Sequence, residues 1–394
     1  MERSVVKQVL EGLKAPSARL QVLMGPRQVG KTTAALQVVS RWEGPTRFAA
    51  ADEVYPASVD WLRTQWSLAR RDAAHGGTAL LVLDEVQKAR GWSEVVKGLW
   101  DEDRRKGFAV RVVLLGSSSL LLAHGTSESL AGRFDRHFCP HWTFAECREA
   151  FGWDLEKWVF FGGYPGAAPL ADDLPSWRKY VRDAIIEPAI ARDVLALEKV
   201  GKPALLRNLF LLACRYPAQA LSYTKMLGQL QDAGNTTTLA HYLDLLEAAW
   251  LVSGLEKHSS ARVRVRGSSP KLLPWTNALV TAVDTRDFST VLADGGVWGR
   301  LVENAVGAHL LAGLPTTSHQ LSWWRKGDDE VDFIVTANDI VWAIEVKSGR
   351  PGSARGLDVF RKMHPDARCV LVGQGGVPLE EFFAASPSEL LAFF

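Results

Sequence analysis

"RLQVLMGPRQVGKTTAALQVVSRW", residues 19–42, runs from an apolar stretch through a glycine-rich loop into a sequence suited to a helix. The spacing of its glycines, lysine and threonine is that of a phosphate-binding loop between a strand and a helix. The glycines let backbone N–H groups face a phosphate, Lys31 neutralises phosphate oxygens, and Thr32 supplies a magnesium ligand. The sequence therefore predicts a site for ATP and Mg²⁺ whose loop residues are Gly25, Pro26, Arg27, Gln28, Val29, Gly30, Lys31, Thr32 and Thr33.

A second apolar stretch, residues 79–83, is followed by Asp84 and Glu85. Paired acids at a strand end also occur as plain solvated loop residues, but a phosphate loop upstream favours a catalytic role. We expect Asp84 to hold the magnesium-bound water and Glu85 to polarise the attacking water. A third strand ends in Ser117 and Ser118, and we expect Ser117 to hydrogen-bond the γ-phosphate or that water.

The stretch SLAGRFDRHF, residues 129–138, carries two arginines that are candidates for a catalytic contact in trans. An arginine placed there can reach the γ-phosphate held by a neighbouring subunit, and removing such a group costs about 10³ or more in rate. Arg133 is the first candidate and Arg136 the second. The spacing is equally compatible with a local ion pair between Arg133 and Asp135 or Glu128.

Five phrases in combination, GPRQVGKTT, LVLDEVQK, LGSSSLLL, LAGRFDRH and FGGYPGA, resemble a group of prokaryotic ATPases of the AAA family. The resemblance covers nearly the whole chain. It implies ATP hydrolysis by a homo-oligomer, such as a hexamer, and a C-terminal part of unknown function that ends in a restriction-endonuclease-like fold. Some archaeal relatives are implicated in recognising branched DNA, so branched or structured DNA is the implied partner. Ser117 stands where many AAA proteins carry asparagine.

Residues 221–267 have the pattern of a winged helix-turn-helix. A short helix is expected to end near Asp232, and Gly234 and Asn235 turn the chain into a longer helix. The longer helix has apolar residues at spacings of three and four, namely Leu239, Tyr242, Leu243, Leu246 and Ala249. Two strands, residues 250–256 and 261–267, are expected to follow and to form the wing.

The predicted wing is basic. Residues 257–271 contain five cationic side chains and no acidic one, and three of the arginines alternate with valines. Alternation along a strand places those arginines on one face, where they suit contacts to phosphates without reading the base sequence. The predicted DNA contacts are Arg262, Arg264, Arg266 and Lys271. The alternative is a structural joint between the flanking domains, with these arginines solvated or paired across an interface.

The C-terminal sequence DEVDFIVTANDIVWAIEVKSGR, residues 329–350, predicts paired strands with a metal site. Strand alternation places Glu345 and Lys347 on one side, with Asp332 on the adjacent strand. We expect Asp332 and Glu345 to bind Mg²⁺, Lys347 to orient or deprotonate water, and Glu303 from the preceding helix to complete the shell. This layout resembles the PD-(D/E)xK nuclease core. Such a fold is also retained as a DNA-gripping module without cleavage.

Two further features border this predicted site. Many relatives carry a stretch like K-x-Y-x-x-D-T-G before the domain, whereas this chain has KLLPWTNAL, with Thr276 in the place of the acid. Trp323 and Trp324 lie beside the acidic cluster in sequence, where their rings are candidates for stacking on a base.

The predicted fold is α/β and has four regions. They are an AAA-type P-loop core with a parallel sheet at 1–141, a helical lid at 142–205, a winged helix-turn-helix at 206–270 and an α/β PD-(D/E)xK nuclease-like domain at 271–394. A length of 394 residues suits two or three domains, and 47% hydrophobic with 23% charged residues is typical of globular proteins.

Composition also bears on the environment of the chain. No apolar run approaches the roughly 20 residues of a membrane span, and the N-terminus lacks an apolar signal core. The four cysteines have no spacing suited to zinc or to a disulfide framework. We therefore expect a cytoplasmic protein with reduced cysteines and no membrane partner.

Three functions are compatible with these patterns. The first is an ATP-hydrolysing protein that recognises or remodels branched or structured DNA. The second is a magnesium-dependent DNA nuclease gated by ATP, acting in defence or repair. The third is a nucleotide-dependent switch that binds a protein partner, in which the winged helix is only a joint.

Overall fold

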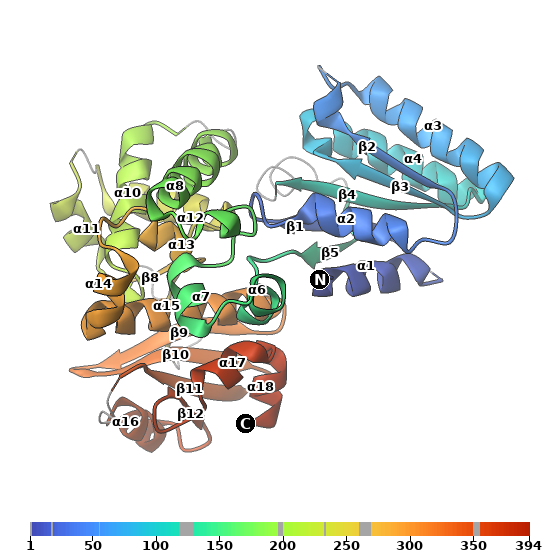
Figure 1. The fold of residues 1–394 in the computed structure, drawn as a ribbon. Coiled ribbons are helices and arrows are strands. Elements are labelled where there is room, and N and C mark those ends of the chain that lie inside the picture. The colour runs from blue at the N-terminus through green and yellow to red at the C-terminus, as the bar shows by residue number, and fades with distance from the viewer. Residues whose placement is uncertain are drawn as a thin grey trace. The chain divides into compact units, whose positions relative to one another are not determined.

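The computed structural model describes most of the chain (Figure 1). The described residues are 2–16, 19–54, 56–117, 130–195, 200–231, 234–259, 269–349 and 355–394, and at Ser117 only the backbone is described. The chain forms two compact units. One comprises Met1–Pro140 and Arg192–Lys199, and the other comprises His141–Ala191 and Val200–Phe394.

The N-terminal unit is built on a five-stranded sheet in the order β2-β3-β4-β1-β5, with every neighbouring pair parallel. Parallel strands covered on both faces are near-continuous apolar runs, and every residue of β1 and β3 is buried. The prediction of a parallel sheet is confirmed. The strands are β1 (Leu20–Gly25), β2 (Thr46–Ala50), β3 (Ala79–Asp84), β4 (Val110–Ser117) and β5 (Phe134–Phe138).

Helices cover both faces of this sheet (Figure 1). α3 (Val59–Gly76) and α4 (Trp92–Lys106) pack on one face and share its core, which includes the fully buried Trp66. α1 (Ser4–Lys14) and α2 (Lys31–Ser40) pack against each other on the opposite face. A buried carboxylate joins α3 to α4, because Asp103 accepts from the Trp66 indole at 2.7 Å and from Arg70 at 2.6 Å.

The second unit begins with helices and short turns. α6 (Phe144–Phe151) and α7 (Leu155–Phe161) are followed by a 3-10 turn (Ala168–Leu170) and α8 (Leu174–Tyr180). Two π-helical turns, Val181–Ile186 and Ala189–Val194, lead on towards α10 (Pro203–Arg215). The helical character expected for residues 142–205 is therefore observed, although residues 141–191 pack within the second unit.

The predicted winged region contains α11 (Tyr223–Gln229) and α12 (Thr236–Ala248), and two strands of the region join a strand just beyond it in a three-stranded sheet of order β6-β8-β7. Asn235 caps α12, accepting from the Thr238 N–H at 2.8 Å, and the apolar residues expected to face the core are buried. The strands are β6 (Gln219–Ala220), β7 (Val252–Leu255) and β8 (Lys271–Pro274). The second predicted wing strand, 261–267, lies outside the described residues.

The C-terminal part carries a four-stranded mixed sheet of order β12-β11-β10-β9. β9 (Gln320–Lys326), β10 (Asp329–Ala337) and β11 (Ile340–Lys347) are antiparallel neighbours, while β12 (Arg368–Gly373) runs parallel to β11. The helices of this part are α13 (Asn277–Thr281), α14 (Phe288–Ala293), α15 (Gly295–Gly313), α16 (Arg355–Met363), α17 (Leu379–Ala384) and α18 (Pro387–Phe393).

Buried polar side chains tie the start of α13 to α7 and α15. Asn277 donates to the carbonyls of Val159 and Leu301 at 2.7 and 2.9 Å, and Thr276 Oγ1 accepts from the Gly163 N–H at 3.3 Å. Thr276 and Asn277 are both buried. Thr276 is the residue at which the chain departs from the family pattern. Its role here is structural, since this buried hydroxyl is partnered by a backbone N–H.

Among the described residues, no helix combines the length and the apolar character needed to cross a membrane. The four cysteines form no disulfide with one another.

Candidate functional site

The loop between β1 and α2 has the backbone shape of a phosphate cradle. A Cβ at Gly25 would lie 2.0 Å from the Cys139 carbonyl oxygen, so only glycine fits there. Gly30 is left-handed at φ 89°, and α2 begins at the next residue with its N–H groups free to face an anion. Gln28 is also left-handed, at φ 58°. Positive φ at a residue other than glycine is a strained conformation of the kind that clusters at ligand clamps.

The Lys31 ammonium lies within the curl of this loop. Its Nζ donates to the carbonyl oxygens of Gly25 and Pro26 at 2.9 and 2.7 Å. Burial lowers the pKa of Lys31, against the effect of nearby acids that include Glu85 and Asp84. These two carbonyls are neutral, so a phosphate oxygen would be a stronger partner for the ammonium.

Asp84 and Glu85 stand at the end of β3, close to the start of α2. The Thr32 hydroxyl donates to Asp84 Oδ2 at 2.8 Å, and the Glu85 N–H donates to Asp84 Oδ1 at 2.9 Å. A hydroxyl oxygen beside a buried carboxylate is the oxygen donor set that Mg²⁺ takes in phosphate-loop proteins. The structure thus brings together the two residues predicted to hold the ion.

Glu85 has an environment suited to accepting a proton. Its backbone is left-handed at φ 52°, and Gln87 Nε2 donates to its Oε2 at 2.7 Å. Burial raises its pKa, and the charge of Lys88 opposes this. A raised pKa makes the carboxylate a better base than an exposed glutamate.

The serines at the end of β4 and Arg133 are the remaining residues predicted for the ATP site. Ser117 is the last residue of β4, and its backbone pairs with Gly25, which places it beside the loop. Ser118 lies outside the described residues. Arg133 Nε and Nη2 donate to the carboxylate of Asp101 in α4 at 2.9 and 3.2 Å. Arg133 is therefore paired with an acid other than the two weighed from the sequence, Asp135 and Glu128, and its action in trans stays a prediction.

The sequence gives no indication of the bond between Arg27 and Asp193. The Arg27 guanidinium donates from Nε and Nη2 to both carboxylate oxygens of Asp193 at 2.5 and 2.6 Å, across 166 positions. Burial lowers the pKa of Arg27, but the hydrogen bond and charge of Asp193 outweigh this and raise it. The side chain of this predicted loop residue is thus bonded to an acid in the π-helical turn Ala189–Val194.

Removing the guanidinium should destabilise the N-terminal unit. Arg27→Met leaves the Asp193 carboxylate, which is 6% exposed, without its cation, and should lower the free energy of unfolding by about 3 kcal/mol. Urea unfolding followed by tryptophan fluorescence measures this. In the double variant Arg27→Met/Asp193→Asn most of the loss should be recovered. If the loss in the double variant instead equals the sum of the losses in the two single variants, the assigned bond is contradicted.

A second cluster of charged groups lies in the C-terminal part of the other unit. Carboxylate oxygens of Glu303 in α15 and of Glu330 and Asp332 in β10 lie within 4.8 Å of one another. On β11, Lys347 Nζ donates to Glu345 Oε1 at 2.6 Å, and the Val346 N–H donates to Asp332 Oδ2 at 2.8 Å. The four residues predicted to form the metal site therefore converge.

Glu330 is a member of this cluster that the sequence analysis missed. It lies two positions before Asp332, and alternation along a strand would have placed both on one face. The pairing of β10 with β9 shifts register between Val331 and Ile334, the irregularity that contains Asp332.

Two carboxyl groups of the cluster have perturbed acidity. Burial and the charge of Asp332 raise the pKa of Glu303 to about 8, against the effect of Lys271. Burial and Asp332 likewise raise the pKa of Glu345 to about 7. Glu345 Oε2 is buried and has no hydrogen-bond partner in the described part of the chain.

The prediction that Lys271 contacts DNA is wrong. Its side chain is fully buried, and Nζ lies 2.5 Å from Glu303 Oε1, 3.2 Å from Glu330 Oε1 and 3.5 Å from Asp332 Oδ1. Burial lowers the pKa of Lys271, but the three acids outweigh it and the net pKa is raised. The residue lies on a central strand and not on the wing, so its charge faces the interior.

The sequence also predicts that three arginines and two tryptophans contact nucleic acid. Arg262, Arg264 and Arg266 lie outside the described residues. Trp323 and Trp324 are only 3% and 5% exposed, so neither ring offers a face for a base, and that expectation is wrong. Trp324 packs in a core cluster with Phe360 of α16.

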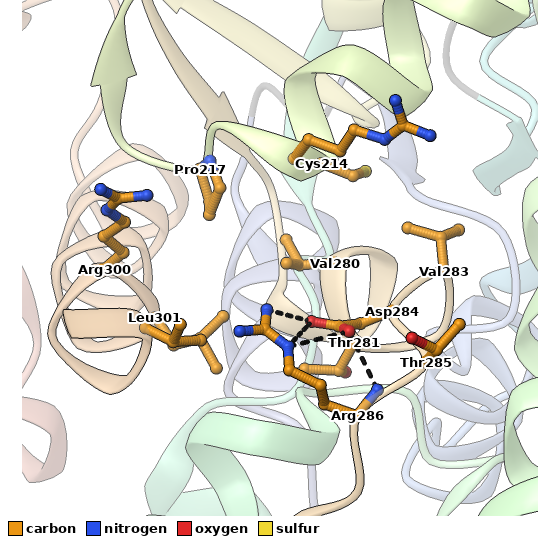
Figure 2. Close-up of a pocket in the computed structure, with 12 residues that line it drawn as sticks. Cys214, Pro217, Val280, Thr281, Val283, Asp284, Thr285, Arg286, Arg300 and Leu301 are labelled. Carbon is orange, nitrogen blue, oxygen red and sulfur yellow. Dashed lines mark hydrogen bonds and ion pairs between the residues drawn. The ribbon is translucent and has the colours of Figure 1, made fainter. Parts of the chain in front are cut away.

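Figure 2 shows a pocket of about 330 Å³ in the second unit. Arg286 and Asp284 point toward each other there and share hydrogen bonds of 2.5 to 3.1 Å, so each already has a partner. Val280 and Leu301 form an apolar part of its wall. None of the residues predicted from the sequence as site residues lines it.

Comparison with protein families assigns the N-terminal part. Residues 17–148 match the family described as AAA domain, and this match spans the phosphate loop, the acid pair and all five parallel strands. The N-terminal unit contains an AAA-type P-loop ATPase domain. Residues 152–289 and 298–387 match two domains of unknown function, DUF8612 and DUF4143. No curated protein matches the chain significantly.

Two solved structures are similar to this chain at low identity. The Orc1 protein of Aeropyrum pernix in complex with DNA is 14% identical over 73% of this chain and 93% of that chain, with a TM-score of 0.32. The RuvB Holliday junction branch migration motor of Thermotoga maritima is 17% identical over 66% and 91%, with a TM-score of 0.33. Because these TM-scores are below 0.5, the assignment rests on the family match and on the sheet.

Proposed function

We propose that the chain is an ATP-hydrolysing, DNA-binding protein that acts on branched or structured DNA as a homo-oligomer. The observation that carries the ATPase part is the bond from Thr32 to Asp84, with Glu85 beside it and Lys31 in the adjoining loop. The AAA match over residues 17–148 supports the same activity.

The residues of the loop have separable roles in this proposal. The backbone N–H groups at the start of α2 and the Lys31 ammonium would bind the β- and γ-phosphates. Thr32 and Asp84 would hold Mg²⁺, which supplies neutralisation of phosphate charge when bound. Glu85 would accept the proton of the attacking water, and its raised pKa suits that task.

Lys31→Ala should abolish ATP hydrolysis, because the phosphate oxygens lose their buried cation. Glu85→Gln should keep ATP binding but lower the rate by about 10² or more, since the base is lost. Phosphate release measures the rate, and fluorescent ATP measures binding. Lys7→Ala, an 82% exposed lysine on α1, is the matched control and should behave as wild type. Robust turnover by Lys31→Ala would refute the site.

The DNA part of the proposal rests on the region between residues 206 and 270. The order helix, helix and strand in α11, α12 and β7 supports the predicted winged helix-turn-helix. Exposed Thr236 and His241 lie on the face of α12 opposite its buried residues, where a DNA-facing helix would present polar groups. With Lys271 removed from the set, the wing arginines Arg262, Arg264 and Arg266 are the proposed phosphate contacts.

Changing the three wing arginines to alanine together should weaken DNA binding. It should also reduce the slope of log K against log salt by about 3, because about three counterion-releasing contacts are lost. Fluorescence anisotropy on four-way-junction and duplex DNA at several salt concentrations measures both. A control variant loses the same charge from exposed arginines of α3 and α4, namely Arg63→Ala, Arg71→Ala and Arg105→Ala. Equal affinity and slope in wing variant and wild type would contradict the assignment.

A further inference from the structure

The Lys271 ammonium is coordinated as a bound cation would be. Its three protons have three oxygen acceptors, Glu303 Oε1 at 2.5 Å, Glu330 Oε1 at 3.2 Å and the Asp332 carbonyl at 3.2 Å. Carboxylate and carbonyl oxygens are the ligands that proteins offer to hard divalent cations. The ammonium also lies 5.1 Å from the centroid of the Phe333 ring, which favours a positive charge.

The predicted magnesium ligands do not fit the ion in this arrangement. Mg²⁺ binds oxygen at about 2.0–2.1 Å, so an ion held by Glu303 and Asp332 would have to share their oxygens with the ammonium. The metal ion and the Lys271 ammonium would repel each other at short range. This repulsion would be strong because Lys271 is buried away from solvent. Moving the ammonium away would be unfavourable, because the side chain is fully buried and its acidic partners would lose their cation.

The other charges of the cluster are also largely matched. Lys347 pairs with Glu345, and Arg325 Nε donates to Glu330 Oε2 at 2.9 Å. Among the described residues, four carboxyl groups therefore face three cationic groups, so the net charge is at most one negative unit even when every carboxyl group is ionised. This remaining negative charge is smaller than the two units that would neutralise a divalent cation.

We propose that Lys271 is the built-in cation of this cluster and takes the place of the divalent metal ion. The cluster then joins β8, β10 and α15, and the C-terminal part does not cleave DNA by a metal-dependent reaction. This inference concerns the second unit alone and is independent of ATP hydrolysis. It favours a binding role over the nuclease that the sequence pattern left open.

Manganese binding tests the proposal directly. The full chain carrying Asp84→Asn, which removes the ion ligand of the ATP site, is titrated with Mn²⁺ without nucleotide and followed by electron paramagnetic resonance. In this background no Mn²⁺ should bind at the cluster. Adding Lys271→Met, which keeps the volume and removes the charge, should create a site for one Mn²⁺ per chain and make the melting temperature rise with Mn²⁺. Lys225→Met, an exposed lysine of α11, is the matched control and should gain no site.

Binding of one Mn²⁺ per chain in the Asp84→Asn background, abolished by adding Asp332→Asn, would overturn the proposal. This comparison decides the matter even if Lys271→Met fails to fold. A cleavage assay gives a second readout, with supercoiled plasmid and Mg²⁺ and with Asp84 intact. The plasmid should stay uncut, and nicking that Glu345→Ala abolishes would also overturn the proposal. Neither result depends on whether the chain hydrolyses ATP.

Discussion

The hydrogen bond from Thr32 to Asp84 joins the first turn of α2 to the end of β3, two strands away from β1 in the sheet. The bond exists because parallel strands end at one edge, where the loop after β1 and the acid after β3 meet. The neighbouring residue, Lys31, is held by carbonyls of the same loop. A nucleotide would replace these internal partners by phosphate and metal, so the contacts within the protein already place the groups that the proposed reaction needs.

The two charged clusters of the chain are neutralised in different ways. Within the described part of the N-terminal unit, the hydrogen-bond partners of the Lys31 ammonium are neutral carbonyls, and Asp84 is partnered by a hydroxyl and an amide, so both retain charge for a ligand. In the C-terminal part Lys271 is saturated by its own protein. Because unpartnered charge attracts ligands and paired charge holds structure, the first cluster suits turnover and the second suits packing.

The phosphate loop and the strands around it could be predicted from the sequence because their signals are local. Gly25, Gly30 and Lys31 lie within seven positions, and β1 and β3 are largely apolar runs. The bond between Arg27 and Asp193 could not be predicted, since it depends on how a distant turn returns to the loop. Lys271 was misplaced for a related reason. In sequence it continues a run of basic residues, but it lies on β8, which pairs with a strand on each side, and it is buried. A count of charges along the chain contains no information about burial.

The proposed ATPase activity requires that the loop at residues 25–32 binds a triphosphate with the help of a metal ion. Isothermal titration of the purified chain with a non-hydrolysable ATP analogue, with and without Mg²⁺, tests this most directly. Binding of one analogue per chain that strengthens with Mg²⁺, and that loses this dependence in Asp84→Asn, is the predicted result. An affinity that is absent, or that is indifferent to Mg²⁺ in the wild-type chain, would contradict the account.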